Sequence, residues 1–235
     1  MRLLTLTLIF VVWSGSAAYA GDLTCALPFS FVDRWADTDG SATYDAEELY
    51  DPLLTGFVAP ADVGFPLTLT AANPMSPAAE NSYVLIALPP MGSGAPPQTG
   101  ESWLRKWVSQ CAPYGVSSGD SLSLEPGTLF SALLEELNGL VAADPDAYWD
   151  DATMTVKGSA FGVTPRLLAV SCFDPRYPPT SSDNYVVVTK IAVVFLESTT
   201  GPTTIQVRFI DNATETVAVK AATWGRVKND FGTQD

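Results

Sequence analysis

The stretch that decides the fold is Tyr185-Val-Val-Val-Thr-Lys-Ile-Ala-Val-Val-Phe-Leu196, which is almost wholly β-branched, aliphatic or aromatic. Residues of these types favour extended strands. Two runs of the same kind lie on either side of it, at 166–173 and 203–210, and clusters of turn-forming residues separate the three runs. The C-terminal half of the chain is therefore predicted to be mostly sheet.

The same patterns predict strands further upstream. Residues 67–71 alternate between apolar and polar, residues 83–88 are continuously apolar as in a central strand, and residues 121–124 alternate briefly. Residues 217–227 are compatible with one more strand. Few periodic apolar stretches occur between residues 21 and 66, which predicts an irregular arm there.

Two helices interrupt the strands. One is predicted at 101–111, where Trp103 and Trp107 fall on a single apolar face. The other is predicted at about 129–143, with Thr128 as its N-cap and Asp144-Pro145 as its end. Strands with two interposed helices predict an α+β fold, rich in β, with a mostly antiparallel sheet or sandwich.

The N-terminal segment has the features of a signal peptide. Arg2 precedes an apolar run that is too short to span a bilayer, and Ala18-Tyr-Ala20 fits a cleavage site. The alternative is retention of this segment as an anchor. The expected organisation is a signal peptide at 1–20 and a single domain at 21–235, made of the arm at 21–66, a core at 67–228 and a flexible tail at 229–235. The protein is then periplasmic or secreted, with no transmembrane span after cleavage.

The composition of the chain argues against several classes of function. The chain of 235 residues carries 12 basic and 26 acidic residues, a formal net charge of −14, and no histidine. The negative charge opposes binding to nucleic acid and to anionic lipid. The absence of histidine removes the usual general base and the commonest zinc ligand. These features predict a protein that is not an enzyme and acts by contact with other proteins.

Three cysteines, Cys25, Cys111 and Cys172, are far apart in the chain. In an oxidising compartment they predict one disulfide and one free thiol, and the spacing leaves all three pairings open. Cys172 lies in an apolar run, where a cysteine is typically a small buried hydrophobic residue.

Acidic residues are concentrated in the arm. An EF-hand loop with Gly40 at its glycine position would place its first ligand on Trp35 and its twelfth on Ala46, so that register fails. The preferred interpretation is a solvated acidic turn. The alternative is a weak calcium site, with calcium as the only cofactor considered, built from Asp33, Asp37, Asp39, Asp45 and Glu48.

A second group of carboxylates surrounds Tyr148-Trp149. Asp144 and Asp150 are candidates for the acid and the nucleophile of a hydrolase, since glycosidases use paired carboxylates. The preferred interpretation is a helix end followed by a turn whose aromatic residues cover the core. Trp103 and Trp107 are likewise expected to be core residues, with a carbohydrate-binding platform as the alternative.

Several stretches stand in a fixed order along the chain. The first is Cys25-Ala-Leu-Pro-Phe-Ser-Phe-Val-Asp-Arg-Trp35, and the last is Lys190-Ile-Ala-Val-Val-Phe-Leu-Glu197. Between them lie Ala61-Asp-Val-Gly64, Leu88-Pro-Pro90, Leu124-Glu-Pro-Gly127, Ala143-Asp-Pro-Asp-Ala-Tyr-Trp-Asp150 and Phe173-Asp-Pro175. Taken together, they resemble the extracytoplasmic C-terminal domain of TadG-like proteins, which are linked with Flp-type (tight-adherence) pilus assembly.

This resemblance covers roughly residues 25–210. It implies a bacterial cell-envelope protein whose partners are envelope or pilus-assembly proteins, with no catalytic residues to transfer. It also implies that Cys25 and Cys111 form the disulfide. TadG-like proteins usually begin with a long membrane helix, whereas a short signal peptide precedes the domain here. The alternative functions are a calcium-stabilised adhesin or carbohydrate-binding module and, third, an acid hydrolase using Asp144 and Asp150.

Overall fold

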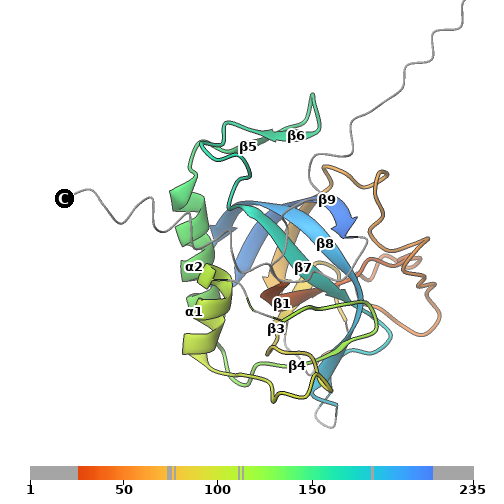
Figure 1. The fold of residues 1–235 in the computed structure, drawn as a ribbon. Helices are drawn as coiled ribbons and strands as arrows, with labels where there is room; N and C mark the ends of the chain where they lie inside the picture. Colours follow the sequence, from red (N-terminus) through yellow and green to blue (C-terminus); the bar gives the residue numbers. More distant parts are fainter. Residues whose placement is uncertain are drawn as a thin grey trace, which may run out of the picture.

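The computed structural model describes residues 26–72, 76, 78–110, 112, 114–180 and 183–213 (Figure 1). It is rich in β-structure, with two helices, which confirms the α+β prediction. The elements in chain order are β1 (Ala26–Val32), β2 (Pro66–Ala71), β3 (Ser82–Leu85), α1 (Glu101–Gln110), β4 (Ser121–Ser123), α2 (Phe130–Ala143), β5 (Tyr148–Asp150), β6 (Thr155–Lys157), β7 (Leu167–Phe173), β8 (Tyr185–Thr200) and β9 (Thr204–Ala213).

The main sheet closes on itself instead of forming a sandwich. Its seven strands lie in the order β4-β8-β7-β1-β3-β2-β9, and β8 also pairs with β9. Six strands therefore form a ring, and β4 extends it from β8. The β1–β7 and β2–β3 pairs are parallel and the other pairs are antiparallel. Closure leaves the six strands of the ring without a free edge.

The long strand β8 makes this closure possible. Its 16 residues pair with β4, β7 and β9, and its register with β9 shifts at Val193/Val194 and again at Leu196/Ser198. Such bulges bend a strand and increase its twist. The stretch predicted to be the main strand is thus the strand with the most neighbours.

The prediction of an irregular arm from residue 21 was wrong for β1. Every residue of β1 is buried, and the strand lies between β3 and β7 in the middle of the sheet. The sequence analysis missed this strand because Pro28, which has no backbone N–H to donate, interrupts the apolar run at 26–32. Pro28 falls where the register with β7 shifts, between Ala26 and Ser30, and a bulge is one of the few places where a sheet accepts proline.

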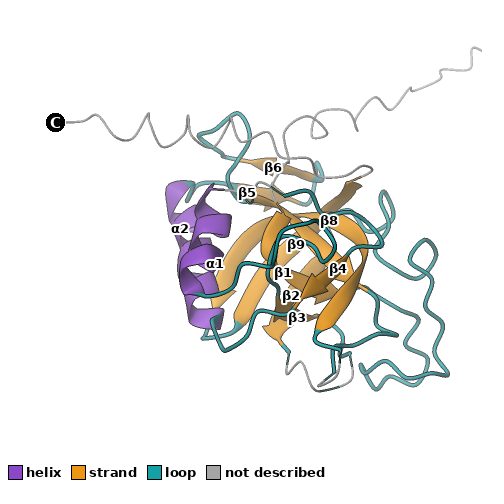
Figure 2. Ribbon diagram, turned by 60° about the horizontal axis from the view of Figure 1, so that its bottom comes forward, coloured by secondary structure: helices purple, strands orange, loops and turns teal. Residues whose placement is uncertain are grey.

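One face of each barrel strand and both helices share a single core. It contains Phe29, Tyr83, Val194 and Phe209 from the strands, together with Leu133 and Leu137 of α2. The helices lie together on one side of the barrel (Figure 2).

Both predicted helices are confirmed. The predicted cap at Thr128 is wrong, because the first helical bond runs from Leu133 N to Leu129 O and Leu129 occupies the cap position without a side-chain bond.

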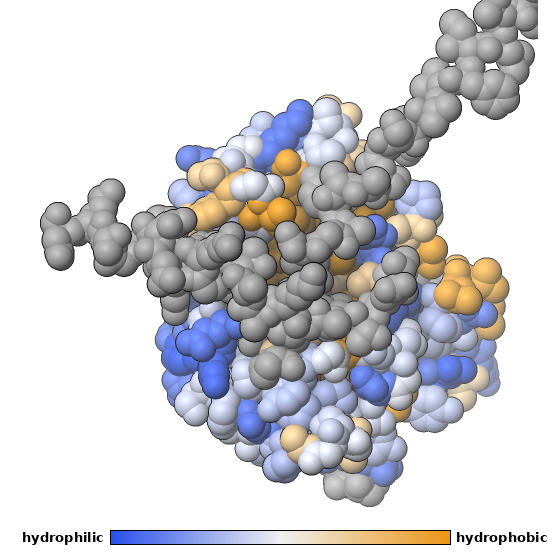
Figure 3. All heavy atoms as spheres, viewed as in Figure 1, coloured by the Kyte–Doolittle hydropathy of each residue, from blue (hydrophilic) through white to orange (hydrophobic). Residues whose placement is uncertain are grey.

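The remaining predictions differ in outcome. The strands predicted at 67–71, 121–124, 166–173, 185–196 and 203–210 are present within a few residues, while the β5–β6 hairpin was not predicted. The residues from 33 to 65 form an irregular lobe beside the barrel, to the right in Figures 1 and 3. This segment is called the arm below.

Several predictions fall outside the described residues. They concern the signal peptide at 1–20, the Cys25–Cys111 disulfide, the strand at 217–227 and the tail. Cys172 is a free cysteine with no exposed surface, as its apolar setting predicted, and burial raises its pKa. No helix within the described ranges has the length and apolar character needed to cross a bilayer.

Candidate metal site in the N-terminal arm

A buried ion pair holds the base of the arm. Asp33 has no exposed surface, and its Oδ2 lies 3.0 Å from Nζ of Lys190 in β8. The same carboxylate accepts hydrogen bonds from the Tyr50 hydroxyl at 2.8 Å and from the Phe57 backbone N–H at 3.0 Å. Burial, followed by the charge of Asp33, raises the pKa of Tyr50. Asp33 therefore ties the arm to the barrel and does not join the other predicted ligands.

The backbone approaches this ion pair closely at Gly56. A Cβ atom there would lie 2.5 Å from Lys190 Nζ and 2.6 Å from Asp33 Oδ2. Real Cβ atoms essentially never come so close to other atoms, so a side chain at this position would have to displace the ion pair. Arg34 adds a second clamp, because it binds Asp62 through two hydrogen bonds of 2.8 Å and donates to the Thr55 and Gly56 carbonyls.

Three of the five predicted calcium ligands do converge. Asp37, Asp39 and Glu48 each offer a carboxylate oxygen, and these oxygens lie within 4.8 Å of one another. Two oxygens bound to one calcium ion at about 2.4 Å can be at most about 4.8 Å apart, so the group has the dimensions of a calcium site. Among the described residues, no cation forms an ion pair with any of the three.

The order of these residues in the chain matches an EF-hand loop in a register that the sequence analysis did not test. Counting Asp37 as the first position places Asp39 third, Ser41 fifth, Thr43 seventh, Asp45 ninth and Glu48 twelfth. In EF-hand loops these are the ligand positions: the seventh supplies a backbone carbonyl, the ninth often acts through water, and the twelfth is a bidentate glutamate. The segment Asp37-Thr-Asp-Gly-Ser-Ala-Thr-Tyr-Asp-Ala-Glu-Glu48 thus carries an oxygen-bearing group at each of them. It is called the acidic loop below.

The backbone explains why this register was missed. The sixth position of an EF-hand loop is an invariant glycine at a sharp turn. Here that position is Ala42, which adopts the left-handed conformation with φ 57°, a region that alanine rarely occupies. The earlier register assigned the glycine role to Gly40, the nearest glycine, and so moved every ligand by two residues. The carboxylates at positions one, three and twelve were the signal that could have found it.

Hydrogen bonds fold the acidic loop around its first residue. The Gly40 N–H donates to Asp37 Oδ1 at 2.8 Å, and the Ala42 N–H donates to Asp37 Oδ2 at 3.1 Å. Desolvation raises the pKa of Asp37, but these two amides outweigh it and hold the pKa below its usual value. Asp37 is therefore ionised and fixed at neutral pH.

Glu48 points inward at the other end of the loop. Only 6% of its surface is exposed, and its two carboxylate oxygens accept the Thr38 N–H at 3.3 Å and the Asp45 N–H at 3.1 Å. An ionised carboxylate has about four acceptor sites, so each oxygen can still bind a cation. The Asp45 side chain instead accepts the Glu47 N–H at 2.8 Å.

The loop is braced by strand-like pairings and not by the two helices of an EF-hand. Its two ends meet through the bridge between Ala36 and Leu49, where the Ala36 N–H donates to the Leu49 carbonyl at 3.0 Å. Its middle is held by the bridge between Thr43 and Ala79. Burial raises the pKa of nearby Glu80, and the charges of Asp37 and Glu48 raise it further. Negative charge therefore accumulates around the site.

The candidate hydrolase residues are engaged in structural contacts. Asp144 is 1% exposed and accepts bonds from the Ser159 hydroxyl at 2.6 Å and the Ala160 N–H at 3.1 Å. Although desolvation raises its pKa, these bonds bring the pKa below the usual value. A hydrogen bond from Lys157 lowers the pKa of Asp150 to about 2. Neither carboxylate has the raised pKa that a general acid needs.

The aromatic candidates on α1 pack on each other. The rings of Trp103 and Trp107 stack with centroids 5.0 Å apart, and Lys106 Nζ lies 4.4 Å from the Trp103 centroid. Trp107 is only 3% exposed, so at most one of the two rings can face a ligand. This arrangement gives more support to a core role than to a sugar-binding platform.

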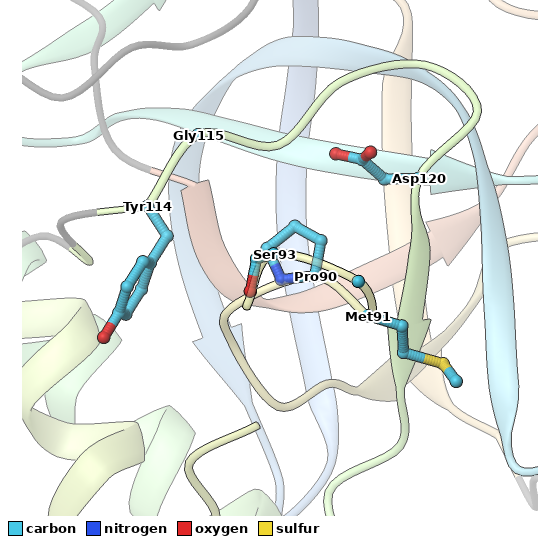
Figure 4. Close-up of a pocket in the computed structure, with 7 residues that line it drawn as sticks. Pro90, Met91, Ser93, Tyr114, Gly115 and Asp120 are labelled. Atoms are coloured by element: carbon cyan, nitrogen blue, oxygen red, sulfur yellow. The ribbon is translucent and has the colours of Figure 1, made fainter. Parts of the chain in front are cut away.

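A cavity of about 370 Å³ lies beyond these rings (Figure 4). It is lined by two loop segments, 90–93 and 114–115, and by Asp120. In Figure 4 the side chains of Tyr114 and Met91 point in different directions, and Asp120 Oδ2 already accepts the Ser117 N–H at 2.7 Å. The cavity thus lacks the convergent polar groups of a specific small-molecule site. No family model, curated protein or solved structure matches this chain. Of the features described above, the acidic loop points most directly to a ligand, because its carboxylates converge.

Proposed function

We propose that this protein is a calcium-stabilised binding domain without enzymatic activity, which acts outside the cytoplasm by contact with other proteins. The acidic loop carries the proposal, because its ligand types, their order and the convergence of Asp37, Asp39 and Glu48 all fit one calcium ion. The predicted signal peptide supports the location.

Calcium fits the site better than other metals do. The donors are carboxylate, hydroxyl and carbonyl oxygens, which suit hard cations, whereas zinc and copper prefer the imidazole and thiolate ligands that the loop lacks. Magnesium demands near-ideal octahedral geometry, whereas calcium accepts the irregular, higher coordination that a flexible loop provides. Extracellular calcium modules bind at about 0.1–1 mM, the range in which this site would operate.

The ion would add positive charge beside carboxylates that the fold stabilises through backbone amides. Asp37, Asp39 and Glu48 repel one another at close range with no paired cation among the described residues. A ligand that binds only the native state stabilises it by about 2 kcal/mol at roughly fifty times its dissociation constant. The arm should therefore be the part of the molecule that responds to calcium.

Thermal unfolding tests this proposal. In calcium at about fifty times the dissociation constant, the melting temperature should rise by roughly 4–8 °C over that in chelator, and magnesium at the same concentration should give a smaller rise. Asp39→Asn should reduce the rise to about half or less at the same calcium concentration, since it removes a ligand charge while its amide oxygen still accepts the Ser41 N–H.

The matched control is Glu47→Gln. Glu47 is exposed and occupies the eleventh position of the loop, which supplies no ligand. This variant should keep the full calcium response. A melting temperature that calcium leaves unchanged in the wild-type protein would refute the calcium site.

The biological process is proposed from the sequence resemblance to TadG-like proteins. That resemblance supports a role with envelope proteins in Flp-type pilus assembly, and the structural engagement of Asp144 and Asp150 supports action by contact instead of catalysis. Affinity capture from envelope extracts, with calcium present, tests this role. Recovery of pilus-assembly components would support it, and recovery of envelope proteins unrelated to pili would assign the domain to another process.

A further inference from the structure

Three leucines in the arm are highly exposed. Leu49 is 62% exposed, and Leu53 and Leu54 are each 78% exposed. Single exposed apolar residues are normal on a protein surface, but a group of large ones marks an interaction site. Figure 3 shows an apolar patch at the edge of the molecule where the arm lies in Figure 1. These residues are called the leucine tip below.

The turn that carries Leu53 and Leu54 is firmly fixed. The Asp51 carbonyl accepts the N–H groups of Leu54 at 3.1 Å, Thr55 at 2.9 Å and Gly56 at 3.1 Å. The Asp51 carboxylate accepts the Leu53 N–H at 2.8 Å. A turn whose backbone is already ordered loses little backbone conformational entropy when a partner buries its side chains, which favours binding.

The barrel side of the turn is fixed as well. Lys190 Nζ donates to the carbonyls of Pro52 and Phe57, and it is the same group that pairs with Asp33. The contacts of Lys190 with these two carbonyls and with Asp33 therefore fix the backbone that carries the leucine tip. At its other end, Leu49 directly follows Glu48, the last residue of the acidic loop.

Uncompensated acidic residues surround the leucine tip along the chain. Asp45 and Glu47 are exposed, and within the described ranges neither of them forms an ion pair. Three cations that contact the arm are already paired: Arg34 with Asp62, Lys190 with Asp33 and Arg176 with Asp174. This part of the surface thus offers apolar contact beside net negative charge.

We infer that the leucine tip is a docking surface for a protein segment that combines apolar side chains with lysine and arginine. The apolar residues of the partner would cover the leucines, and its basic residues would pair with the acidic side chains. An anionic membrane would be repelled by those side chains, and a second copy of this chain, with a formal net charge of −14, would be repelled overall. This inference rests on the proposed contact function, since it names the surface and the chemistry of the partner.

Selection from a random peptide library displayed on phage tests the inference on the purified full chain, with calcium present. The selected peptides should contain aliphatic or aromatic residues next to lysine or arginine. Their affinity for the Leu53→Ser/Leu54→Ser variant should fall by about 30-fold or more, as for the loss of a central binding contact. The affinity should also decrease as salt increases.

The control is Met91→Ser, because Met91 is 49% exposed and lies outside the arm. This variant should bind the peptides as the wild type does. Acidic peptides, peptides that bind the leucine double variant equally well, or no enrichment would each overturn the inference. Calcium-dependent binding to anionic vesicles that is lost in the double variant would assign the leucine tip to membranes, and tip-dependent dimerisation in sedimentation would assign it to a second copy.

These outcomes are separable from the calcium proposal. The leucine double variant should retain the calcium-induced rise in melting temperature, because Leu53 and Leu54 lie outside the acidic loop. A retained rise without peptide binding would reject the docking surface alone. A missing rise with peptide binding intact would reject the calcium site alone.

Discussion

The barrel and the arm are stabilised in opposite ways. The barrel buries aromatic and aliphatic side chains such as Phe29, Phe195 and Phe209 completely, and its ring of strands pairs its own edges. The arm contains little regular structure and is held by carboxylates: Asp33 on Lys190, Asp62 on Arg34, and the acidic loop on its own amides. The comparison indicates that burial of apolar side chains stabilises the barrel. The arm is stabilised instead by the ion pairs and hydrogen bonds of its carboxylates.

The substitution expected to destabilise the barrel most is one that removes a fully buried aromatic ring. Phe209→Ala should lower the free energy of unfolding by about 3–5 kcal/mol, since the cavity would lie in the shared core. Urea denaturation with and without calcium measures the effect. The loss should be the same in both conditions, and a loss below about 1 kcal/mol would show that the barrel core is not packed as described.

The substitution expected to destabilise the arm most is one that leaves Lys190 without its ion-pair partner. Asp33→Asn removes the charge that faces a lysine side chain only 11% exposed, which should cost about 3 kcal/mol. Because the damage is local, hydrogen exchange should accelerate at arm amides such as Phe57 more than in β7. Equal loss of hydrogen-exchange protection in the arm and in β7 would contradict the view that the two regions are stabilised separately.

A pair of glycine substitutions gives effects of opposite sign. Gly56→Ala should destabilise the protein by about 1–3 kcal/mol, because the new methyl group would collide with Asp33 and Lys190. Gly139→Ala lies in α2 with nothing near its Cβ position and should stabilise by about 0.5–1 kcal/mol. Thermal unfolding of both variants checks the prediction, and a neutral Gly56→Ala would contradict the close approach at the base of the arm.

The smallest expected effect is a change in one titration. Burial first, and then the charges of Asp37 and Glu48, raise the pKa of Glu80 above its usual value. A raised carboxyl pKa means that Glu80 opposes folding once the pH exceeds its unfolded value, and this opposition grows until the pH passes the folded one. Calcium should neutralise both neighbours, so the Glu80 pKa should fall, as measured by NMR. A Glu80 pKa that calcium leaves unchanged would place the ion elsewhere.

Local sequence patterns predicted most of the barrel but not its closure. The β-branched run at 185–196 identified the longest strand because its side chains are buried on the barrel. The pairing of β8 with β9 and of β1 with β7 depends on contacts between distant residues, which no local pattern contains. Pro28 concealed β1, since a proline at a bulge looks the same in sequence as a proline in a loop.

The candidate site was predicted in composition but not in register. Asp37, Asp39 and Glu48 were named among the ligands, and they converge. Asp33 was included only because it is an acidic residue of the same arm, and its buried partner Lys190 is distant in sequence. The left-handed conformation of Ala42 cannot be inferred from an alanine, so the loop was aligned on the wrong residue.

Isothermal titration of the purified chain with calcium tests most directly the claim that the arm needs a cation. The account predicts one site with a dissociation constant of about 0.1–1 mM, weakened at least about 10-fold in Asp39→Asn and unchanged in Glu47→Gln. Absence of binding at about 10 mM calcium, or equal binding by Asp39→Asn and the wild type, would contradict it.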